Sequence, residues 1–178
     1  QIQEPIVKRE PKVVPQPYSA EQLAADVPEF AKFDLGAEVL SAVKDMGYLS
    51  PTPIQSAAIP VILQGRDVIG TAQTGTGKTA AFALPTIKLA GGHSDIGPRI
   101  LVLSPTRELA AQSAEAFVNF SKYTPLVTLL LQGGTSMDKQ IRALRSGVDA
   151  VVATPGRLLD HIRQRNLTLK NVQWLLLD

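Results

Sequence analysis

The segment from Ala72 to Thr79 has residue types and spacing suited to phosphate binding. It reads Ala72-Gln73-Thr74-Gly75-Thr76-Gly77-Lys78-Thr79. The glycines let backbone amides converge on phosphate oxygens, Lys78 supplies a positive charge, and the Thr79 hydroxyl can coordinate Mg²⁺. An apolar run, Asp67 to Thr71, precedes the segment, and an apolar helical pattern, Ala80 to Leu89, follows it. Strand, glycine-rich turn, lysine and helix in this order predict a P-loop that binds a nucleoside triphosphate.

Two residues near the P-loop leave alternatives open. Ala72 stands where the usual pattern begins with glycine, and a flexible turn with a chance lysine is the alternative, which the flanking elements disfavour. Upstream, Thr52 and Pro53 can start a helix, and the amide of Gln55 can donate to and accept from an adenine edge. From the residues alone, Gln55 could equally be an exposed glutamine at a helix start.

Three further segments place small residues and backbone amides directly after apolar runs. They are Pro105-Thr106-Arg107, Gly133-Gly134 and Thr154-Pro155-Gly156-Arg157. Thr154 suits an N-cap with Pro155 at the first helical position, so helix amides would face an anion and Arg157 would add charge. Residues 135–138 have a capping-box pattern that begins another helix. Taken singly, each segment could be an ordinary strand-to-helix turn. Arg107 could pair with Glu108 or another surface acid instead, and the same alternative stays open for Arg157.

The elements that must position these residues follow from the apolar pattern. Short runs that are apolar on both faces predict strands at Asp67–Thr71, Ile100–Ser104, Val127–Leu131, Ala150–Ala153 and Trp174–Leu177. Segments of helical length separate them, at Arg107–Phe120, Ser136–Leu144 and Gly156–Arg163, and helices are also expected at Leu35–Met46 and Ile54–Leu63. This alternation predicts an α/β fold with a parallel sheet covered by helices on both faces. Ligands of such sheets bind at the carboxyl ends of the strands.

Composition sets broad limits. The 178 residues, 44% of them hydrophobic, suffice for one compact domain, and a net charge of +2 does not by itself indicate a nucleic-acid partner. The chain has no cysteine, so a metal must be bound mainly by oxygen atoms.

We find neither a membrane-spanning run nor a signal peptide, and therefore expect a soluble, cytoplasmic protein without membrane contact. Four prolines in the first 17 residues predict an extended tail, and residues 19–32 could be linker or an appended helix.

Taken together, the motifs resemble those of the DEAD-box RNA helicases, from Phe33 to the last residue. The segments that carry the resemblance are the stretch ending at Gln55, the P-loop, Pro105-Thr106-Arg107-Glu108-Leu109-Ala110, Gly133-Gly134, Thr154-Pro155-Gly156-Arg157 and Leu175-Leu176-Leu177-Asp178. The resemblance implies a P-loop NTPase whose first RecA-like domain covers residues 33–178 after a tail and linker at 1–32. It implies further that this domain is truncated at its C-terminal end and that the second RecA-like domain is absent.

The same resemblance assigns roles to the candidate residues. Gln55 would read adenine with Phe33 lying over the base, while residues 72–79 hold the phosphates of ATP. The three strand-end segments would contact the sugar-phosphate backbone of RNA without regard to base sequence. Asp178 closes an apolar run, where its carboxylate would join Thr79 at Mg²⁺.

Lys78, Thr79 and Asp178 are therefore the expected catalytic residues. In the family, the residue after this aspartate orients the attacking water, so we expect this chain to bind ATP but not to hydrolyse it appreciably. The parent protein would couple ATP hydrolysis to RNA binding and local duplex unwinding. Two alternatives stay open: a superfamily 2 DNA helicase, and a non-catalytic, ATP-regulated RNA clamp or scaffold.

Overall fold

The computed structural model describes residues 12–73 and 75–178, which form two compact units. The first, which we call the sheet unit, contains residues 12–13, 93–114 and 126–178. The second, the helical unit, contains residues 14–92 and 115–125. Helix α6 (Arg107–Phe120) contributes its first half to the sheet unit and its second half to the helical unit.

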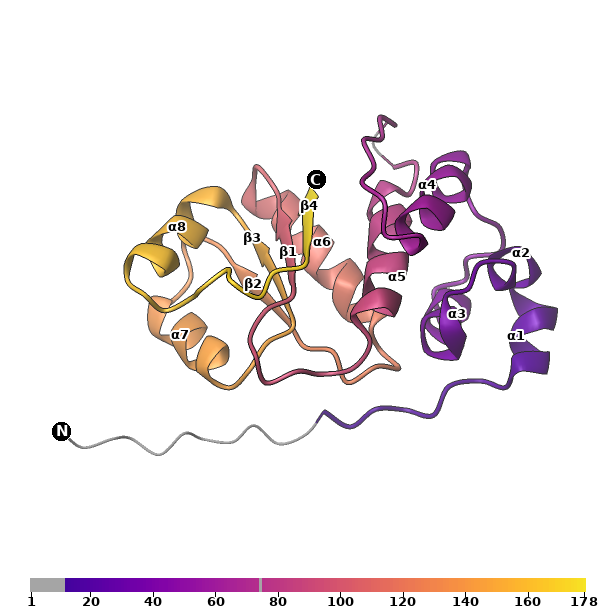
Figure 1. Ribbon diagram of the computed structural model, residues 1–178, viewed down its shortest axis with the longest axis horizontal. Helices are drawn as coiled ribbons and strands as arrows, with labels where there is room; N and C mark the ends of the chain where they lie inside the picture. The colour runs from indigo at the N-terminus through magenta and orange to yellow at the C-terminus, as the bar shows by residue number, and fades with distance from the viewer. Residues whose placement is uncertain (1–11, 74) are drawn as a thin grey trace. The chain divides into compact units, whose positions relative to one another are not determined.

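The sheet unit is built on four parallel strands in the order β2-β3-β1-β4 (Figure 1). The strands are β1 (Ile100–Leu103), β2 (Thr128–Leu131), β3 (Ala150–Ala153) and β4 (Trp174–Leu177). Their register pairs Leu103 with both Ala153 and Leu177, and Ala153 with Leu131. All four strands therefore end in line, and the residue that follows each of them emerges at the same edge of the sheet.

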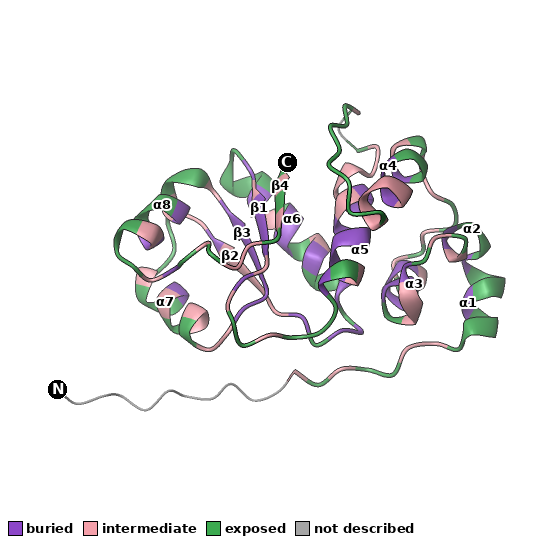
Figure 2. Ribbon diagram, in the orientation of Figure 1, coloured by how far each residue is buried: buried purple, intermediate pink, exposed green. Residues whose placement is uncertain are grey.

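Apolar side chains on alternate strand positions bury one face of this sheet. Leu101, Leu131 and Val151 pack in one core with Leu158 of helix α8 (Pro155–Arg163). Helix α7 (Met137–Arg145) adds Leu144 to the same core. The opposite positions of β1 and β3, such as Ile100, Val102 and Val152, are also fully buried, as expected of parallel strands covered on both faces. The edge strand β4 differs, because Leu175 and Leu177 are exposed (Figure 2).

The helical unit contains five complete helices and no strand among its described residues. They are α1 (Ala20–Asp26), α2 (Pro28–Ala31), α3 (Gly36–Asp45), α4 (Pro53–Leu63) and α5 (Lys78–Ala90). Helices α4 and α5 pack against each other, and Ile59 of α4 and Leu84 of α5 are fully buried. The helices that the sequence predicts around residues 35–46, 54–63 and 80–89 are confirmed.

The segment that the sequence left open between linker and helix is helical. Ser19 caps α1 in a capping box with Gln22, and Val27 leads into α2. Just before α1, the backbone N–H of Tyr18 donates to Ser41 Oγ at 3.0 Å, which attaches the chain to α3. The proline-rich tail expected before it falls mostly on residues 1–11, outside the described residues.

Asp45, at the end of α3, collects three donors within the helical unit. Its carboxylate accepts from Tyr18 Oη at 3.0 Å, from Tyr123 Oη at 2.8 Å and from Lys122 Nζ. Burial alone would raise the pKa of Asp45, but hydrogen bonds from Lys122, Tyr123 and Tyr18 outweigh it and lower that pKa. Burial and the bond to Asp45 raise the pKa of Tyr123 to about 12.

One predicted strand is wrong. Residues 67–71 form no strand, and the segment between α4 and α5 is exposed, with Ile69 entirely so (Figure 2). A parallel strand needs a neighbouring strand for its backbone N–H and C=O groups, and the four described strands pair only with one another. The apolar runs correctly predicted strands in the other four segments. An apolar run does not show whether a neighbouring strand is present to pair with it.

The predicted capping box at residues 135–138 is also wrong in detail. Helix α7 begins one residue later than that pattern implies, with Ser136 as the N-cap accepting from the backbone N–H of Lys139. The Thr135 hydroxyl instead donates to the Gln132 carbonyl at 3.0 Å and accepts from Gln140 Nε2. Among the described residues, no helix has both the length and the apolar character needed to cross a membrane.

Candidate functional site

The P-loop lies in the helical unit, between the exposed segment and helix α5. Gly75 and Gly77 adopt φ angles of +80° and +85°, a backbone conformation that other residues rarely adopt, so both glycines are required for the turn. Helix α5 begins at Lys78, whose Nζ donates to the Ala72 carbonyl at 2.7 Å. The loop thus closes on itself through the lysine that would bind phosphate. Thr74 lies outside the described residues.

Gln55 reaches this loop from the start of helix α4. It is 2% exposed, its Oε1 accepts from the Thr52 backbone N–H at 2.9 Å, and its Nε2 donates to the Gly77 carbonyl at 3.2 Å. A Cβ on Gly77 would lie 2.3 Å from Gln55 Nε2, so the second P-loop glycine also makes room for this amide. The exposed-glutamine alternative is therefore wrong, and Gln55 connects the start of α4 to the phosphate loop.

Phe33 follows helix α2 and is half-buried. Its ring packs edge-on against Phe30, with 6.3 Å between the centroids and an angle of 72° between the planes. Phe30 is fully buried, whereas Phe33 keeps part of its ring accessible. A partly exposed aromatic ring on a buried aromatic support is suited to stacking on a flat ligand.

In the sheet unit, the three predicted strand-end segments meet in one concavity. This strand-end pocket has a volume of about 410 Å³ and is lined by Pro105, Thr106, Arg107, Gly133, Thr154, Gly156, Arg157 and Asp160. The common register explains the convergence, because β1, β2 and β3 all end at this edge. Two helices also start here: the Thr106 hydroxyl accepts from the Leu109 N–H at 3.2 Å to cap α6, and Pro155 opens α8. The pocket therefore combines two arginines with helix N-termini, a combination that favours anions.

Arg107 explains why two glycines stand together at 133–134. Its guanidinium lies over this turn, and a Cβ on Gly134 would come within 2.6 Å of Arg107 Nη1. Gly134 also has a φ of +84°, which disfavours any side chain there. Within the described part of the chain, the ion pairs do not include Arg107, so pairing with Glu108 is not what holds it.

Arg157 is held by neighbours that the sequence interpretation missed. Its Nη1 donates to the Thr135 carbonyl at 3.1 Å and to Gln140 Oε1 at 3.2 Å, while its Nε lies 4.0 Å from Asp160 Oδ2. Gln140 in turn accepts from the fully buried His161. A signal for Gln140 exists in the sequence: it occupies a position on the apolar stripe of α7 with Met137, Ile141 and Leu144, where a polar residue needs a buried partner.

Asp178 follows β4 at the same edge of the sheet. Its backbone N–H donates to the Leu103 carbonyl at 2.9 Å, and its carboxylate accepts from the Ser113 hydroxyl at 2.6 Å. Ser113, on α6, is a second residue that sequence reasoning missed.

The two predicted metal ligands lie in different units. Asp178 belongs to the sheet unit and Thr79 to the helical unit, and each has the hard oxygen donor that Mg²⁺ prefers. Across residues 12–73 and 75–178 there is no cluster of three or more His, Asp or Glu residues suited to a metal.

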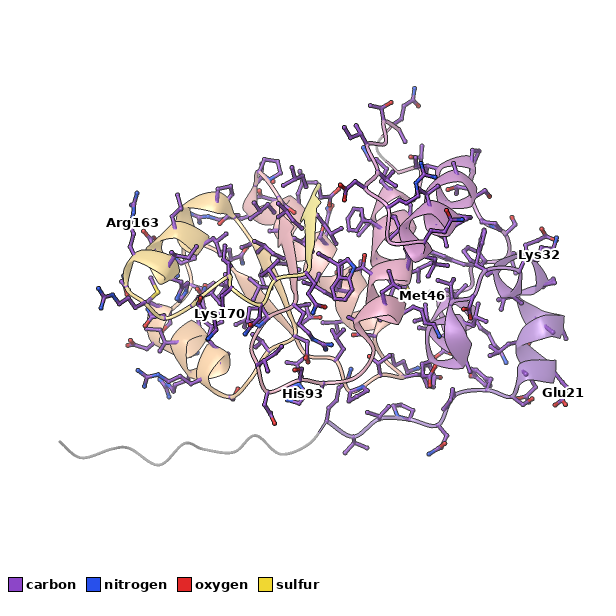
Figure 3. All side chains as sticks on the ribbon, viewed as in Figure 1. Glu21, Lys32, Met46, His93, Arg163 and Lys170 are labelled. Carbon is purple, nitrogen blue, oxygen red and sulfur yellow. The ribbon has the colours of Figure 1, made fainter. Side chains whose placement is uncertain are left out.

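A second polar cluster lies at the opposite, amino-terminal edge of the sheet, near the labelled His93 (Figure 3). Here the fully buried Asp149 accepts from His93 Nδ1 at 2.8 Å, Arg99 Nη2 at 3.1 Å, and the backbone N–H groups of Ser94 and Val127. Four donors satisfy a buried carboxylate and fix the starts of β1 and β3. These bonds connect the segments that precede β1, β2 and β3.

A P-loop motif that opens a helix, and a parallel sheet whose strands end in register at one edge, define an α/β protein of the RecA-like class. The comparison with protein families specifies this class further. The family described as DEAD/DEAH box helicase matches residues 52–178, more than half of the chain. The chain belongs to this family.

Relatives and solved structures agree with this assignment. The chain is 53% identical over 154 residues to the ATP-dependent RNA helicase DeaD of Buchnera aphidicola subsp. Baizongia pistaciae (strain Bp), covering 84% of the chain and 25% of the relative. It is 51% identical over 150 residues to the protein of the same name in Escherichia coli (strain K12), covering 84% and 24%. The chain thus spans about a quarter of the length of the curated relatives it matches.

Among solved structures, a DEAD box protein from the hyperthermophile Methanococcus jannaschii superimposes with a TM-score of 0.78 at 38% identity. That match covers 84% of this chain and 41% of the other. A hypothetical ATP-dependent RNA helicase from Sulfolobus tokodaii gives a TM-score of 0.72 at 35% identity, covering 79% and 40%. The predicted fold, an α/β RecA-like domain with a parallel sheet flanked by helices, is confirmed.

Proposed function

We propose that this chain is the ATP-binding domain of an ATP-dependent RNA helicase and that it binds both ATP and the RNA backbone. The observation that carries the proposal is the convergence of three separate strand-end segments, with Arg107 and Arg157, in one pocket of about 410 Å³. Such a pocket suits a phosphate backbone rather than base edges. The names of the relatives, which are ATP-dependent RNA helicases, support the choice of RNA. A role on RNA agrees with the cytoplasmic location expected from the sequence.

For the nucleotide, we assign the phosphates of ATP to residues 72–79. Lys78 would exchange its bond to the Ala72 carbonyl for bonds to phosphate oxygens, and the amides at the start of α5 would add further donors. As Mg²⁺ ligands we assign the Thr79 hydroxyl and the Asp178 carboxylate, each taken in its own unit, because each is a hard oxygen donor of the kind that this ion prefers. The metal would neutralise charge that develops on the phosphates during transfer.

For the base, we assign adenine to Gln55 with Phe33 as a stacking surface. Gln55 already donates to the Gly77 carbonyl, so an adenine that engages its amide would also change the P-loop. Phe33 is half-buried and supported by Phe30, which suits it to lie over a planar base. The same contacts would be weaker for guanine, whose edge presents a different order of donors and acceptors.

For RNA, we assign the sugar-phosphate backbone to the strand-end pocket and the adjoining Gly134 and Pro155. Guanidinium groups and helix N-termini bind phosphates without reading bases, so binding should not depend on sequence. In the whole protein, ATP binding and hydrolysis would be coupled to this contact and to local separation of short duplexes. A DNA helicase would present a similar phosphate site, so the 2′-hydroxyl is what separates the two activities.

The adenine assignment is tested by Gln55→Ala, with Gln64→Ala as the matched control because Gln64 is exposed at the end of the same helix. We expect Gln55→Ala to weaken ATP binding about tenfold and GTP binding much less, measured by calorimetric titration with Mg²⁺ present. Gln64→Ala should change neither affinity. Equal loss of ATP and GTP affinity would contradict the adenine role of Gln55.

The RNA assignment is tested by comparing oligouridylate with the matching deoxyribose oligomer. We expect fluorescence anisotropy to detect tighter binding of the ribose form, and Arg107→Gln and Arg157→Gln to weaken it about three- to tenfold each. Equal affinity for the two oligomers would favour the DNA-helicase alternative. Normal RNA binding without RNA-stimulated ATPase activity in the whole protein would favour a non-catalytic clamp.

A further inference from the structure

Gln140 of helix α7 is a buried amide beside the strand-end pocket, with 5% of the residue exposed. Its Nε2 donates to the Gln132 carbonyl at 3.0 Å and to Thr135 Oγ1 at 2.5 Å. Its Oε1 accepts from His161 Nε2 at 2.8 Å and from Arg157 Nη1 at 3.2 Å. A primary amide has two N–H donors and two acceptor lone pairs, so these four bonds use its whole capacity.

The partners of Gln140 permit only one orientation of its amide. The Gln132 carbonyl can only accept and the Arg157 guanidinium can only donate, so a rotation of the amide by 180° would break bonds at both ends. His161 reinforces this orientation. It is fully buried, and its Nε2 lies 2.8 Å from Gln140 Oε1, which can only accept, so in this orientation the ring donates through Nε2. Burial, with a contribution from Arg157, lowers the pKa of His161, which keeps the ring neutral.

The same amide connects two of the three segments that form the pocket. Through Nε2 it holds residues 132 and 135, which bracket the glycine pair beneath Arg107. Through Oε1 it holds Arg157 at the start of α8, whose Nη1 also donates to the Thr135 carbonyl. Both of these Arg157 bonds use Nη1, so the guanidinium retains further N–H donors for an anion.

We propose that Gln140, oriented by His161, is a positioning residue that sets Arg157 and the Gly133–Gly134 turn in the geometry that binds the RNA backbone. This inference rests on the proposed RNA contact of Arg157. An arginine fixed by two acceptors before binding loses less conformational freedom when it meets a phosphate. Gln140 itself touches no RNA in this scheme; it acts through Arg157.

A purely structural role for Gln140 predicts a different result from a positioning role. Loss of fold stability lowers the fraction of active protein but leaves the number of phosphate contacts in each active molecule unchanged. Loss of the Arg157 contact instead reduces the salt dependence of RNA affinity, because each phosphate contact to a single strand contributes about −0.7 to the slope of log K against log[salt]. The salt slope therefore separates the two roles.

The test measures anisotropy of labelled oligouridylate with the full chain in a series of KCl concentrations. We expect Gln140→Met to lower RNA affinity about three- to tenfold at low salt and to make the slope shallower by about 0.7. In an Arg157→Met background, Gln140→Met should cause little further loss, because the contact it positions is already gone. Gln112→Met, at an exposed glutamine of α6, is the matched control and should leave both affinity and slope unchanged.

Gln140→Glu is the variant to use in the same RNA-binding measurement if Gln140→Met folds poorly. The glutamate keeps acceptors for His161 and Arg157 but pairs its charge with the guanidinium, so RNA affinity and salt slope should again fall together. An unchanged slope in both variants, or losses that add in the double variant, would overturn the positioning role while leaving the RNA site intact. If Arg157→Met alone left RNA binding unchanged, the proposed role of Arg157 and this inference would both fail.

Discussion

The helical unit and the sheet unit build their candidate sites in different ways. In the helical unit, one continuous segment, residues 72–79, supplies the phosphate loop, Gln55 contacts this loop, and Phe33 is the proposed stacking surface. In the sheet unit, no single segment forms the site: three segments, separated by 25 and 19 residues, meet only because their strands end in register. The first site is local, and the second is a product of topology.

The difference extends to how the arginine and lysine side chains are held. Lys78 is bonded to a carbonyl of its own loop, so its position is set by nearby residues. Arg157 is held by Gln140 and Thr135, which belong to another helix and another turn. We therefore expect ligand binding at the P-loop to be altered by substitutions within the motif itself. Ligand binding at the strand-end pocket, which we call the topological site, should also be altered by substitutions of residues that contact no ligand.

Lys78→Ala should produce the largest effect and affect only the local site. Removing the phosphate-binding charge should cost about 1.5–3 kcal/mol of ATP affinity, or about ten- to a hundredfold. RNA affinity in the absence of nucleotide should be unchanged, since the strand-end pocket lies wholly in the sheet unit. Calorimetric titration with ATP and anisotropy with RNA measure the two effects. Weakened RNA binding without nucleotide would contradict the independence of the two sites.

Gly134→Ala should affect the topological site in the same selective way. A Cβ there would lie 2.6 Å from the Arg107 guanidinium and the residue has a φ of +84°, so we expect a loss of about 1–2 kcal/mol in stability and a several-fold loss of RNA affinity. Gly97→Ala is the matched control, because Gly97 has a φ of +96° in the same unit but open space around it. Equal loss of RNA affinity in both variants would mean that backbone strain, and not displacement of Arg107, is responsible.

The stability of the two units should respond differently to acid. The lowered pKa of His161 means that the unfolded sheet unit takes up a proton near pH 6.5 before the folded one does, so its stability should fall as pH drops below about 6.5. The slope per group is at most about 1.4 kcal/mol per pH unit. The lowered pKa of Asp45 gives the helical unit stability that is lost only as pH falls below about 3.8. Hydrogen exchange of amides in each unit between pH 7.5 and pH 5 would measure this. An unchanged pH dependence in His161→Gln would contradict it.

Asp45→Asn should have the smallest effect and touch neither site. The carboxylate holds Tyr18 and Tyr123, so its loss should cost about 1 kcal/mol of helical-unit stability and loosen the chain before α1. ATP and RNA affinities should be unchanged. Denaturant unfolding followed by Tyr fluorescence measures the cost, and a loss of ATP affinity would show that the attachment of Tyr18 matters to the P-loop.

Much of the fold could be predicted from sequence because its signals are local. The apolar runs at 100–103, 150–153 and 174–177 and the helix over 107–120 are found where the pattern placed them. The failure at 67–71 has a nonlocal cause, since the same apolar signal forms a strand only where a partner strand is present. Similarly, Thr135 looked like a helix cap, but its hydroxyl is occupied by Gln132 and Gln140.

The sequence by itself determined the phosphate loop and the family, because the required glycines, lysine and threonine are contiguous and the backbone conformation they need is a local property. It also named Gln55, Arg107 and Arg157 through their motifs. Only the tertiary structure decided that Gln55 contacts Gly77, that the glycine pair accommodates Arg107, and that Gln140 and His161 hold Arg157. These contacts join residues far apart in the chain, and hydrogen bonding between distant side chains leaves no fixed spacing in a sequence.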